Sequence, residues 1–146
     1  IRLGVHHKLH EYIHDAKAAS DGTEAAEKLA VNAQQVFKTL IVDTGQKILA
    51  VAILPVNQQL NLKLVAKALN VKKVTMANPV MVKRCTGYVL GGISPVGQKR
   101  ALTTIIDASA NAHKSIYVSG GRRGLEIELT AYDLSRVTNG SFAVIT

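Results

Sequence analysis

Aromatic residues, proline and cysteine are scarce in this sequence. Its 146 residues include no Trp, two Phe, four Tyr, three Pro and a single Cys. One cysteine excludes an internal disulfide, which fits a reducing compartment, and the few aromatic rings disfavour a platform that stacks single-stranded bases. Neither a targeting segment nor an apolar run long enough to cross a bilayer is visible, so we expect a soluble cytoplasmic protein with no membrane partner.

The length predicts one domain over residues 1–146. A chain of this size buries roughly 70% of its unfolded surface, so it can fold without a disulfide or a structural metal. The net charge of +8 and the pI near 9.8 favour a polyanionic partner, since cations that contact phosphates release counterions. Because the basic residues are spread along the chain, folding must assemble any patch. The backbone of a structured RNA or DNA is the expected ligand.

Hydrophobic periodicity predicts strands and helices in mixed order. We expect strands over residues 5–13, 35–42, 47–54, 72–76, 102–106, 115–118, 125–129 and 142–145. Four helices are expected to open at cap-like residues: after Asp21 with an apolar face of Ala25, Ala26, Leu29 and Ala30, after Asn61 through Leu69, after Asn78 to a point before Thr86, and after Thr130. A regular alternation of strand and helix is absent. The sequence therefore predicts a mixed α/β fold, with a curled, mostly antiparallel mixed sheet and flanking helices.

Several catalytic motifs are incomplete. His10-Glu11-Tyr12-Ile13-His14 matches the zinc-protease pattern, but its flanking period of two indicates a strand, where the two histidines lie about 13 Å apart and cannot share a metal. Cys85 has no partner histidine in sequence, and Ser94 lacks the surroundings of a hydrolase nucleophile. No P-loop or dinucleotide fingerprint is present, so we expect neither a metal nor a cofactor.

Two glycine-rich stretches and one lysine indicate a binding pocket. Residues 86–98 contain four glycines between strand-like segments, and Ser119-Gly120-Gly121 opens a second glycine turn. Lys38 lies in a strongly apolar strand pattern, where it either faces solvent as an ordinary alternate residue or supplies a fixed cation to a pocket. A cation beside backbone N–H groups suits an anionic group or a polarised ester carbonyl.

Five ordered blocks of the chain resemble the YbaK/EbsC family, the free-standing relatives of the editing domain inserted in bacterial prolyl-tRNA synthetases. The match runs over nearly the whole chain: Leu9-His10-Glu11-Tyr12-Ile13-His14-Asp15, Gln35-Val36-Phe37-Lys38-Thr39-Leu40, the segment from Asn61 to Leu69, the segment from Thr86 through Gly92-Ile93-Ser94-Pro95 to Lys99, and the segment from Tyr117 through Ser119-Gly120-Gly121-Arg122-Arg123-Gly124 to Leu129. The closest similarity is to the branch that deacylates Cys-tRNA(Pro). The resemblance implies a barrel-like curled sheet and removal of a wrongly attached amino acid from tRNA.

The resemblance also implies a site. Lys38 is its essential residue, Tyr12 and Thr39 line it, and Ser119, Gly120 and Gly121 close one wall. The backbone around Gly91, Gly92, Ile93 and Ser94 holds the aminoacyl ester, with N–H groups near Gly92 and Ser94 as catalytic donors. Glu126 stands where close relatives can have Asp, which changes the reach of that carboxylate, and Arg122-Arg123 replaces the commoner Lys-Arg.

For the cysteinyl branch, the resemblance implies that the substrate's own thiol attacks its ester, which makes the enzyme lyase-like, whereas attack by water would make it a hydrolase. Prolyl-tRNA synthetase is the protein partner that the resemblance suggests. Two alternatives remain open: a non-enzymatic aminoacyl-tRNA-binding accessory of a synthetase, and a hydrolase of small esters.

Overall fold

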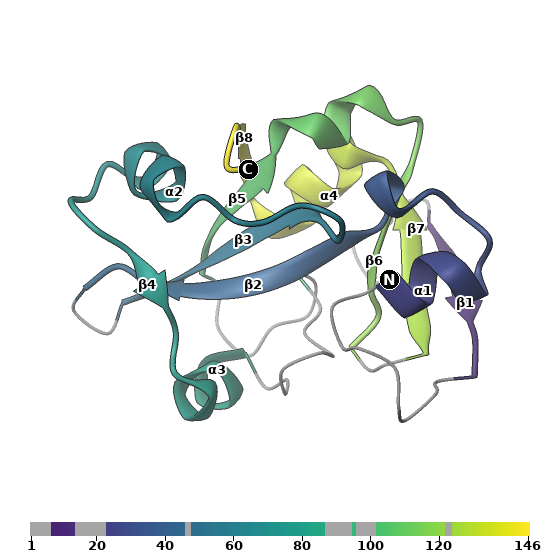
Figure 1. The fold of residues 1–146 in the computed structure, drawn as a ribbon, viewed down its shortest axis with the longest axis horizontal. Helices are drawn as coiled ribbons and strands as arrows, with labels where there is room; N and C mark the ends of the chain where they lie inside the picture. The colour runs from purple at the N-terminus through teal and green to yellow at the C-terminus, as the bar shows by residue number, and fades with distance from the viewer. Residues whose placement is uncertain (1–6, 14–22, 46–47, 87–94, 96–101, 122–123) are drawn as a thin grey trace.

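The computed structural model describes residues 7–13, 23–45, 48–86, 95, 102–121 and 124–146 (Figure 1). Its elements follow in the order β1 (Lys8–Glu11), α1 (Thr23–Lys28), η1 (Ala33–Gln35), β2 (Phe37–Asp43), β3 (Leu49–Pro55), α2 (Leu62–Leu69), β4 (Thr75–Met76), α3 (Pro79–Thr86), β5 (Thr103–Asp107), η2 (Ala108–Ala112), β6 (Ile116–Ser119), β7 (Leu125–Leu129), α4 (Ala131–Thr138) and β8 (Ser141–Ala143). Among these helices, none is long and apolar enough to cross a membrane.

The strands form two sheets that meet at one point. The larger has the order β4-β2-β3-β5-β8, antiparallel between β2 and its two neighbours and parallel from β3 through β5 to β8. The smaller, β1-β7-β6, is antiparallel. A parallel bridge between Val36 and Tyr117 joins the start of β2 to β6. The mixed α/β prediction is confirmed, although the described strands do not close into a barrel.

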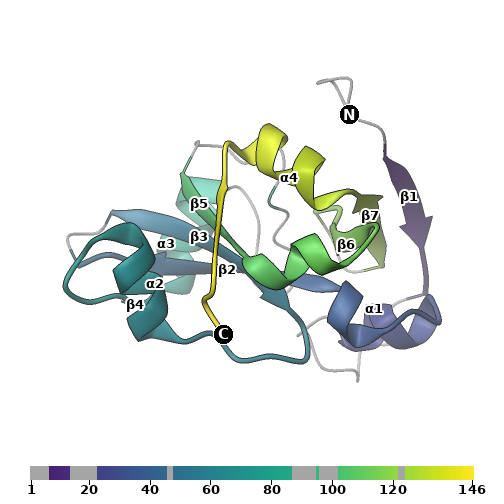
Figure 2. The same ribbon diagram turned by 90° about the horizontal axis from the view of Figure 1, so that it is seen from above.

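Each sheet has an inner and an outer face. The inner faces share the main core, in which Phe37, Ile53, Val118 and Ile127 pack with Leu134 of α4. On the outer face, α2 packs over the larger sheet in a cluster that contains Leu54, Val65, Val42 and Leu40. The segment from α1 through η1 packs over the bridge in a third cluster that contains Ala25, Val36, Tyr117 and Tyr12. Both views show α1 and α2 at opposite ends of the molecule (Figures 1 and 2).

Three of the predicted helix starts are confirmed by their caps. The side chain of Asn61 accepts hydrogen bonds from the N–H groups of Lys63 and Leu64, at 3.1 and 3.2 Å. The Asn78 side chain accepts from Val80 N at 2.8 Å, and Thr130 Oγ1 accepts from Asp133 N at 3.1 Å. These bonds satisfy N–H groups that have no partner within the helix. The proposed cap at Asp21 and Gly22 lies outside the described residues.

Some boundaries differ from the prediction. Ala30 is not part of the apolar helix face, because the helix ends at Lys28 and Ala30 is exposed with a φ of 55°. The third helix includes Thr86. The last strand ends at Ala143, and Ile145 beyond it is buried, with its N–H donating to Asp107 Oδ1 at 3.0 Å. Hydrophobic period alone did not distinguish this anchored end from a strand.

Candidate functional site

Strand register aligns Ser119, Glu126 and His10 across β6, β7 and β1, and an isolated bridge places Lys38 of β2 on the same face. Val36 bridges Tyr117 in parallel, so two residues further along each strand Lys38 lies on the same side as Ser119. Ser119 is the antiparallel partner of Glu126, and Glu126 is the partner of His10. Side chains opposite one another in a ladder share a face. The row therefore lies on the outer face, and we call these four residues the polar row.

Lys38 is the cation of the polar row. It is half-buried in β2, paired with the buried Leu54 of β3, and shares its face with Val36 and Leu40. Apolar walls of this kind lower the local dielectric, which strengthens any interaction of the ammonium with a negative or polarised group. Towards the end of the same strand, β4 pairs with Val42 and Asp43.

Glu126 is the acid of the polar row. Only 6% of this residue is exposed, and no hydrogen bond or ion pair joins its carboxylate to another residue in the described part of the chain. Burial raises the pKa of Glu126 from its ordinary 4.5 to about 7. At neutral pH this carboxyl group can therefore both release and accept a proton.

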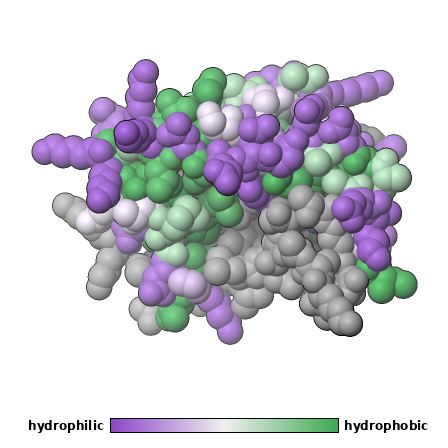
Figure 3. Space-filling model, in the orientation of Figure 1, coloured by the Kyte–Doolittle hydropathy of each residue, from purple (hydrophilic) through white to green (hydrophobic). Residues whose placement is uncertain are grey.

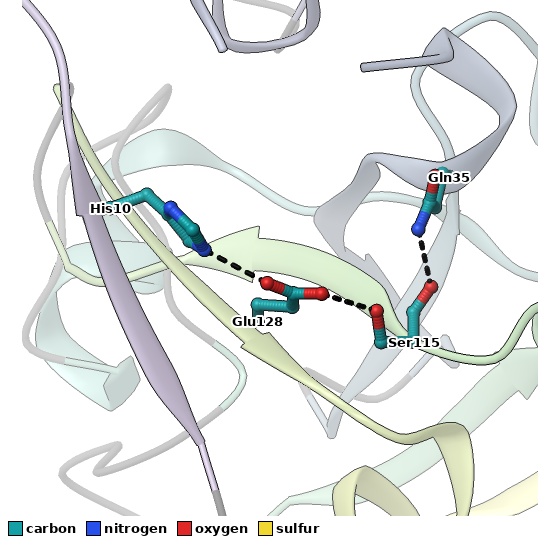
Figure 4. Close-up of polar contacts among 4 residues, drawn as sticks. All are labelled: His10, Gln35, Ser115 and Glu128. Carbon is teal, nitrogen blue, oxygen red and sulfur yellow. Dashed lines mark hydrogen bonds and ion pairs between the residues drawn. The ribbon is translucent and has the colours of Figure 1, made fainter. Parts of the chain in front are cut away.

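Glu128 lies two residues along the same face. Its contacts (Figure 4) lower its pKa, whereas burial raises the pKa of Glu126. Its carboxylate accepts a hydrogen bond from Ser115 Oγ at 2.5 Å and lies 2.9 Å from His10 Nε2. The Ser115 hydroxyl is the main cause that lowers the pKa of Glu128, with further lowering by His10 and Lys8 against a smaller rise from burial. Gln35 Nε2 donates to the Ser115 carbonyl oxygen at 2.9 Å and so ties η1 to this network.

The two carboxyl groups thus occupy environments that separate their pKa values. Such a pair usually assigns one group to a fixed charge and the other to proton transfer. Tyr117, whose ring lies 5.3 Å from the His10 ring, has its pKa raised by burial and by the nearby Glu128 charge. Glu128 therefore ties β7 to His10 of β1 and to Ser115, next to the polar row.

The remaining predicted site residues fall into three groups. Tyr12 is half-buried in the cluster with Val36 and Tyr117, and its N–H donates to Gly124 O at 3.0 Å, so it lies beside the polar row. Thr39 follows Lys38 directly and therefore points to the inner face, where its buried Oγ1 has no hydrogen-bond partner among the described residues. Only its backbone can reach the side of Lys38. Gly91, Gly92, Ile93 and Ser94 lie outside the described residues.

The Ser119-Gly120-Gly121 turn is closely packed. Gly120 N donates to Leu125 O at 2.7 Å, and Gly121, with a φ of 110°, donates to Ser119 Oγ at 3.2 Å. A Cβ on Gly120 would lie 2.5 Å from Leu125 Cγ, closer than carbon atoms can approach. Glycine is required here because the turn folds back against the strand that carries Glu126.

Within the described residues, no group of three or more His, Cys, Asp or Glu side chains could hold a metal ion. The predicted strand at His10 and Glu11 is confirmed, and His10 lies against Glu128. His14 lies outside the described residues.

Sequence reasoning missed the network of Glu128, Ser115 and Gln35 and the elevated pKa of Glu126. One signal was available. Leu125-Glu126-Ile127-Glu128-Leu129 alternates apolar and acidic residues, which places both carboxylates on one face of a strand. The partners that cover this face come from residues 10, 35 and 115, which only the fold brings together.

Comparisons with known proteins identify the family of this chain. The family described as the aminoacyl-tRNA editing domain matches residues 16–137. EbsC of Enterococcus faecalis, whose name provisionally assigns it as a Cys-tRNA(Pro)/Cys-tRNA(Cys) deacylase, is 40% identical over 121 residues, which are 83% of this chain and 74% of EbsC. The hypothetical protein APE2540 superposes with a TM-score of 0.83 at 26% identity, over 97% of this chain and 92% of its own. A candidate trans-editing enzyme for prolyl-tRNA synthetase superposes with a TM-score of 0.84 at 21% identity, over 96% and 86%. The chain belongs to the family of aminoacyl-tRNA editing domains.

Proposed function

We propose that this protein, a single editing domain over residues 1–146, is a free-standing deacylase that removes cysteine from mischarged tRNA(Pro). The observation that carries the proposal is the polar row, in which the Lys38 cation shares one face with a buried carboxyl group that exchanges protons near neutral pH. The name of EbsC supports the choice of substrate.

A separate editing activity has a physical reason. A pocket that accepts proline cannot strongly exclude an amino acid of similar or smaller size, because one methylene group is worth only about 1–3 kcal/mol. Cysteine attached to tRNA(Pro) is such an error. A second site that recognises the thiol removes the product that the first site admits.

In the proposed reaction, the Lys38 ammonium donates a hydrogen bond to the ester carbonyl oxygen. The substrate thiol gives its proton to Glu126 and its sulfur attacks the carbonyl carbon, so that the negative charge on oxygen develops against Lys38. The bond from carbon to the ribose oxygen then breaks, Glu126 returns the proton to that oxygen, and a cyclic cysteine thioester leaves. Intact tRNA is the other product, and water hydrolyses the thioester afterwards.

The free energies available to this mechanism are large enough for catalysis. Well-oriented intramolecular attack can supply about 7–11 kcal/mol, and one preorganised oxyanion donor about 3–4 kcal/mol. A base whose pKa is about 7 is well matched to a thiol whose ordinary pKa is about 8.5. Backbone N–H groups near Gly92 and Ser94 are further candidate donors to the oxyanion, and Ser119, Gly120 and Gly121 form a wall beside it.

The test is turnover of preformed Cys-tRNA(Pro) by the purified protein alone. Lys38→Ala should abolish turnover with the circular dichroism spectrum unchanged, whereas Lys28→Ala, which removes an exposed lysine from α1, should retain it. Ser-tRNA(Pro), with a hydroxyl in place of the thiol, should react much more slowly. Retained turnover in Lys38→Ala would refute the role of this cation, and equal rates for the two substrates would indicate attack by water.

The same assay separates the other candidates. A binding accessory would hold Cys-tRNA(Pro) without turning it over, and a small-ester hydrolase would cleave cysteine esters that lack tRNA as efficiently as Cys-tRNA(Pro). We also propose that prolyl-tRNA synthetase is the partner that supplies the mischarged tRNA. Addition of the synthetase should then raise the rate at limiting tRNA concentration.

A further inference from the structure

Half of the basic residues lie in a stretch that contains no acid. Between Asp43 and Asp107 the sequence has no Asp or Glu, and it includes the basic residues Lys47, Lys63, Lys67, Lys72, Lys73, Lys83, Arg84, Lys99 and Arg100. The polar row uses none of them. Four of these lysines are exposed on α2 and on the link from α2 to β4, and we call Lys63, Lys67, Lys72 and Lys73 the lysine surface.

The lysine surface is held in place by the core. In α2, Val65 and Ala66 are buried against the sheet, and Lys63 and Lys67, four residues apart, share an exposed face. Asn70 ends the helix in a left-handed conformation, and its N–H donates to Lys67 O at 3.2 Å. Lys72 and Lys73 follow between two valines, Val71 and Val74, that pack in the core cluster under α2. Hydrophilic side chains project at this end of the molecule, on the left of Figure 3.

This arrangement works against the stability of α2. Its first turn carries no acidic residue, so Lys63 lies at the positive end of the helix dipole without compensation. Lys63 and Lys67 also repel each other at a spacing where opposite charges would attract. The nearest acid along β2 is Asp43, and its carboxylate accepts a hydrogen bond from Gly45 N at 2.8 Å. Lys67, in the last turn, complements the dipole, so Lys63 is the charge that does not help α2 to form.

The lysine surface lies on the same side of the sheet as Lys38. Lys38, Leu40 and Val42 alternate along one face of β2, and α2 covers the Leu40 and Val42 end of that face. From Lys38 to the β4 pairing at Val42 and Asp43 the distance along the strand is about 15 Å, at ~3.3 Å per residue. Four stacked nucleotides at ~3.4 Å each span a similar distance.

The geometry points to the lysine surface as the docking site for the phosphates of the RNA acceptor arm, a few nucleotides from the ester that Lys38 holds. The inference rests on the proposed function for the identity of that RNA. The four lysines carry charge of one sign and offer no aromatic ring on which a base could stack. Such a surface contacts the phosphate backbone of the RNA and does not read its base sequence. The patch then supplies affinity, and the polar row supplies the chemistry.

The first experiment measures binding of an uncharged acceptor-stem RNA hairpin over a range of salt concentrations. The test variant is Lys63→Ala with Lys67→Ala, and the control is Lys28→Ala with Lys114→Ala, which removes two exposed lysines elsewhere and changes the net charge equally. Each phosphate contact makes the slope of log K against log salt concentration steeper by roughly 0.9. At 0.15 M salt, this contact contributes about fivefold to the affinity. The test variant should bind about 30-fold more weakly with a slope reduced by about 2, and the control should bind like the wild type.

The second experiment measures deacylation of Cys-tRNA(Pro) by the same variants. The test variant should raise KM and leave kcat unchanged on full-length tRNA, and it should match the wild type on a cysteinyl ester of adenosine. If the test variant binds the hairpin as tightly as the wild type, or if the control loses as much affinity as the test variant, the lysine surface is not the RNA docking site. This conclusion holds whether or not the protein is a deacylase. If the wild type binds the hairpin through α2 in a salt-dependent way but does not turn over Cys-tRNA(Pro), the proposed deacylase activity is wrong and the RNA docking site is retained.

Discussion

Replacement of Glu126 by Gln should stabilise the protein in alkaline solution and not in acid. The carboxyl group is buried, and its pKa rises from 4.5 to about 7 on folding. A raised carboxyl pKa means that the folded state binds a proton which the unfolded chain releases, so stability falls as the pH rises from 4.5 to 7. At 1.36 kcal/mol for each pH unit, the ionised group costs about 3 kcal/mol above pH 7. Gln keeps the shape and cannot ionise.

The assay is urea denaturation of both proteins from pH 4 to pH 8.5. The free energy of unfolding of Glu126→Gln minus that of the wild type should be constant below pH 4.5, rise through the window to pH 7, and level off about 3 kcal/mol higher. A constant offset reflects the exchange of an acid for an amide, so the change with pH is the informative part. His10 and Lys38 are present in both proteins, and their direct contributions cancel in the difference.

Glu128→Gln is the matched control, because Glu128 lies on the same strand and face. Its pKa is lowered by the Ser115 hydroxyl and by His10, so its charge stabilises the fold at neutral pH and that contribution is lost as the pH falls. This variant should be less stable than the wild type at pH 7 and converge with it in acid. A difference for Glu126→Gln that stays flat across pH 4–8.5 would show that the Glu126 carboxylate is solvated, and the proton-transfer role proposed for it would fail.

Two further substitutions follow from the packing and from the helix charge. Gly120→Ala places a Cβ 2.5 Å from Leu125 Cγ, so urea denaturation should show a free energy of unfolding lower by about 1–3 kcal/mol. The rate of deacylation should also fall, because the wall beside Glu126 moves. Wild-type values for both quantities would refute the tight packing of this turn. Lys63→Glu should raise the free energy of unfolding by about 0.5–1.5 kcal/mol, because it complements the helix dipole and pairs with Lys67, and it should weaken hairpin binding. If the free energy of unfolding and the affinity for the hairpin both rose or both fell, the inference that Lys63 serves RNA binding at the expense of folding would be wrong.

The predictable part of the fold is the part that local chemistry determines. Asn61, Asn78 and Thr130 cap helices at the predicted places because a short polar side chain satisfies N–H groups two or three residues away. The hairpin of β2 and β3 was predictable because two apolar strand patterns flank Asp43-Thr44-Gly45. Both signals lie within a few residues of the element that they define.

The face on which the site lies is determined by a contact that sequence does not reveal. Lys38 was identified by its position in an apolar strand and by family resemblance, but the bridge between Val36 and Tyr117 is what places it on the same face as Ser119, and these segments are about 80 residues apart. The same bridge and strand alternation turn the Thr39 side chain to the inner face. The pKa of Glu126 depends on burial, and burial is a property of the assembled sheet and helices.

The polar row and the lysine surface share one physical property, which is that each opposes folding. An ionised Glu126 in a buried position costs stability above pH 7, and Lys63, at the positive end of the α2 dipole, is repelled by Lys67. Sequences usually satisfy such local preferences, and departures from them concentrate where function requires them. Lys38 of the polar row and α2, which carries Lys63 and Lys67, lie on the same side of the larger sheet. One substrate that presents an ester at its end and phosphates a few nucleotides away accounts for both, and a small ester would not require the second.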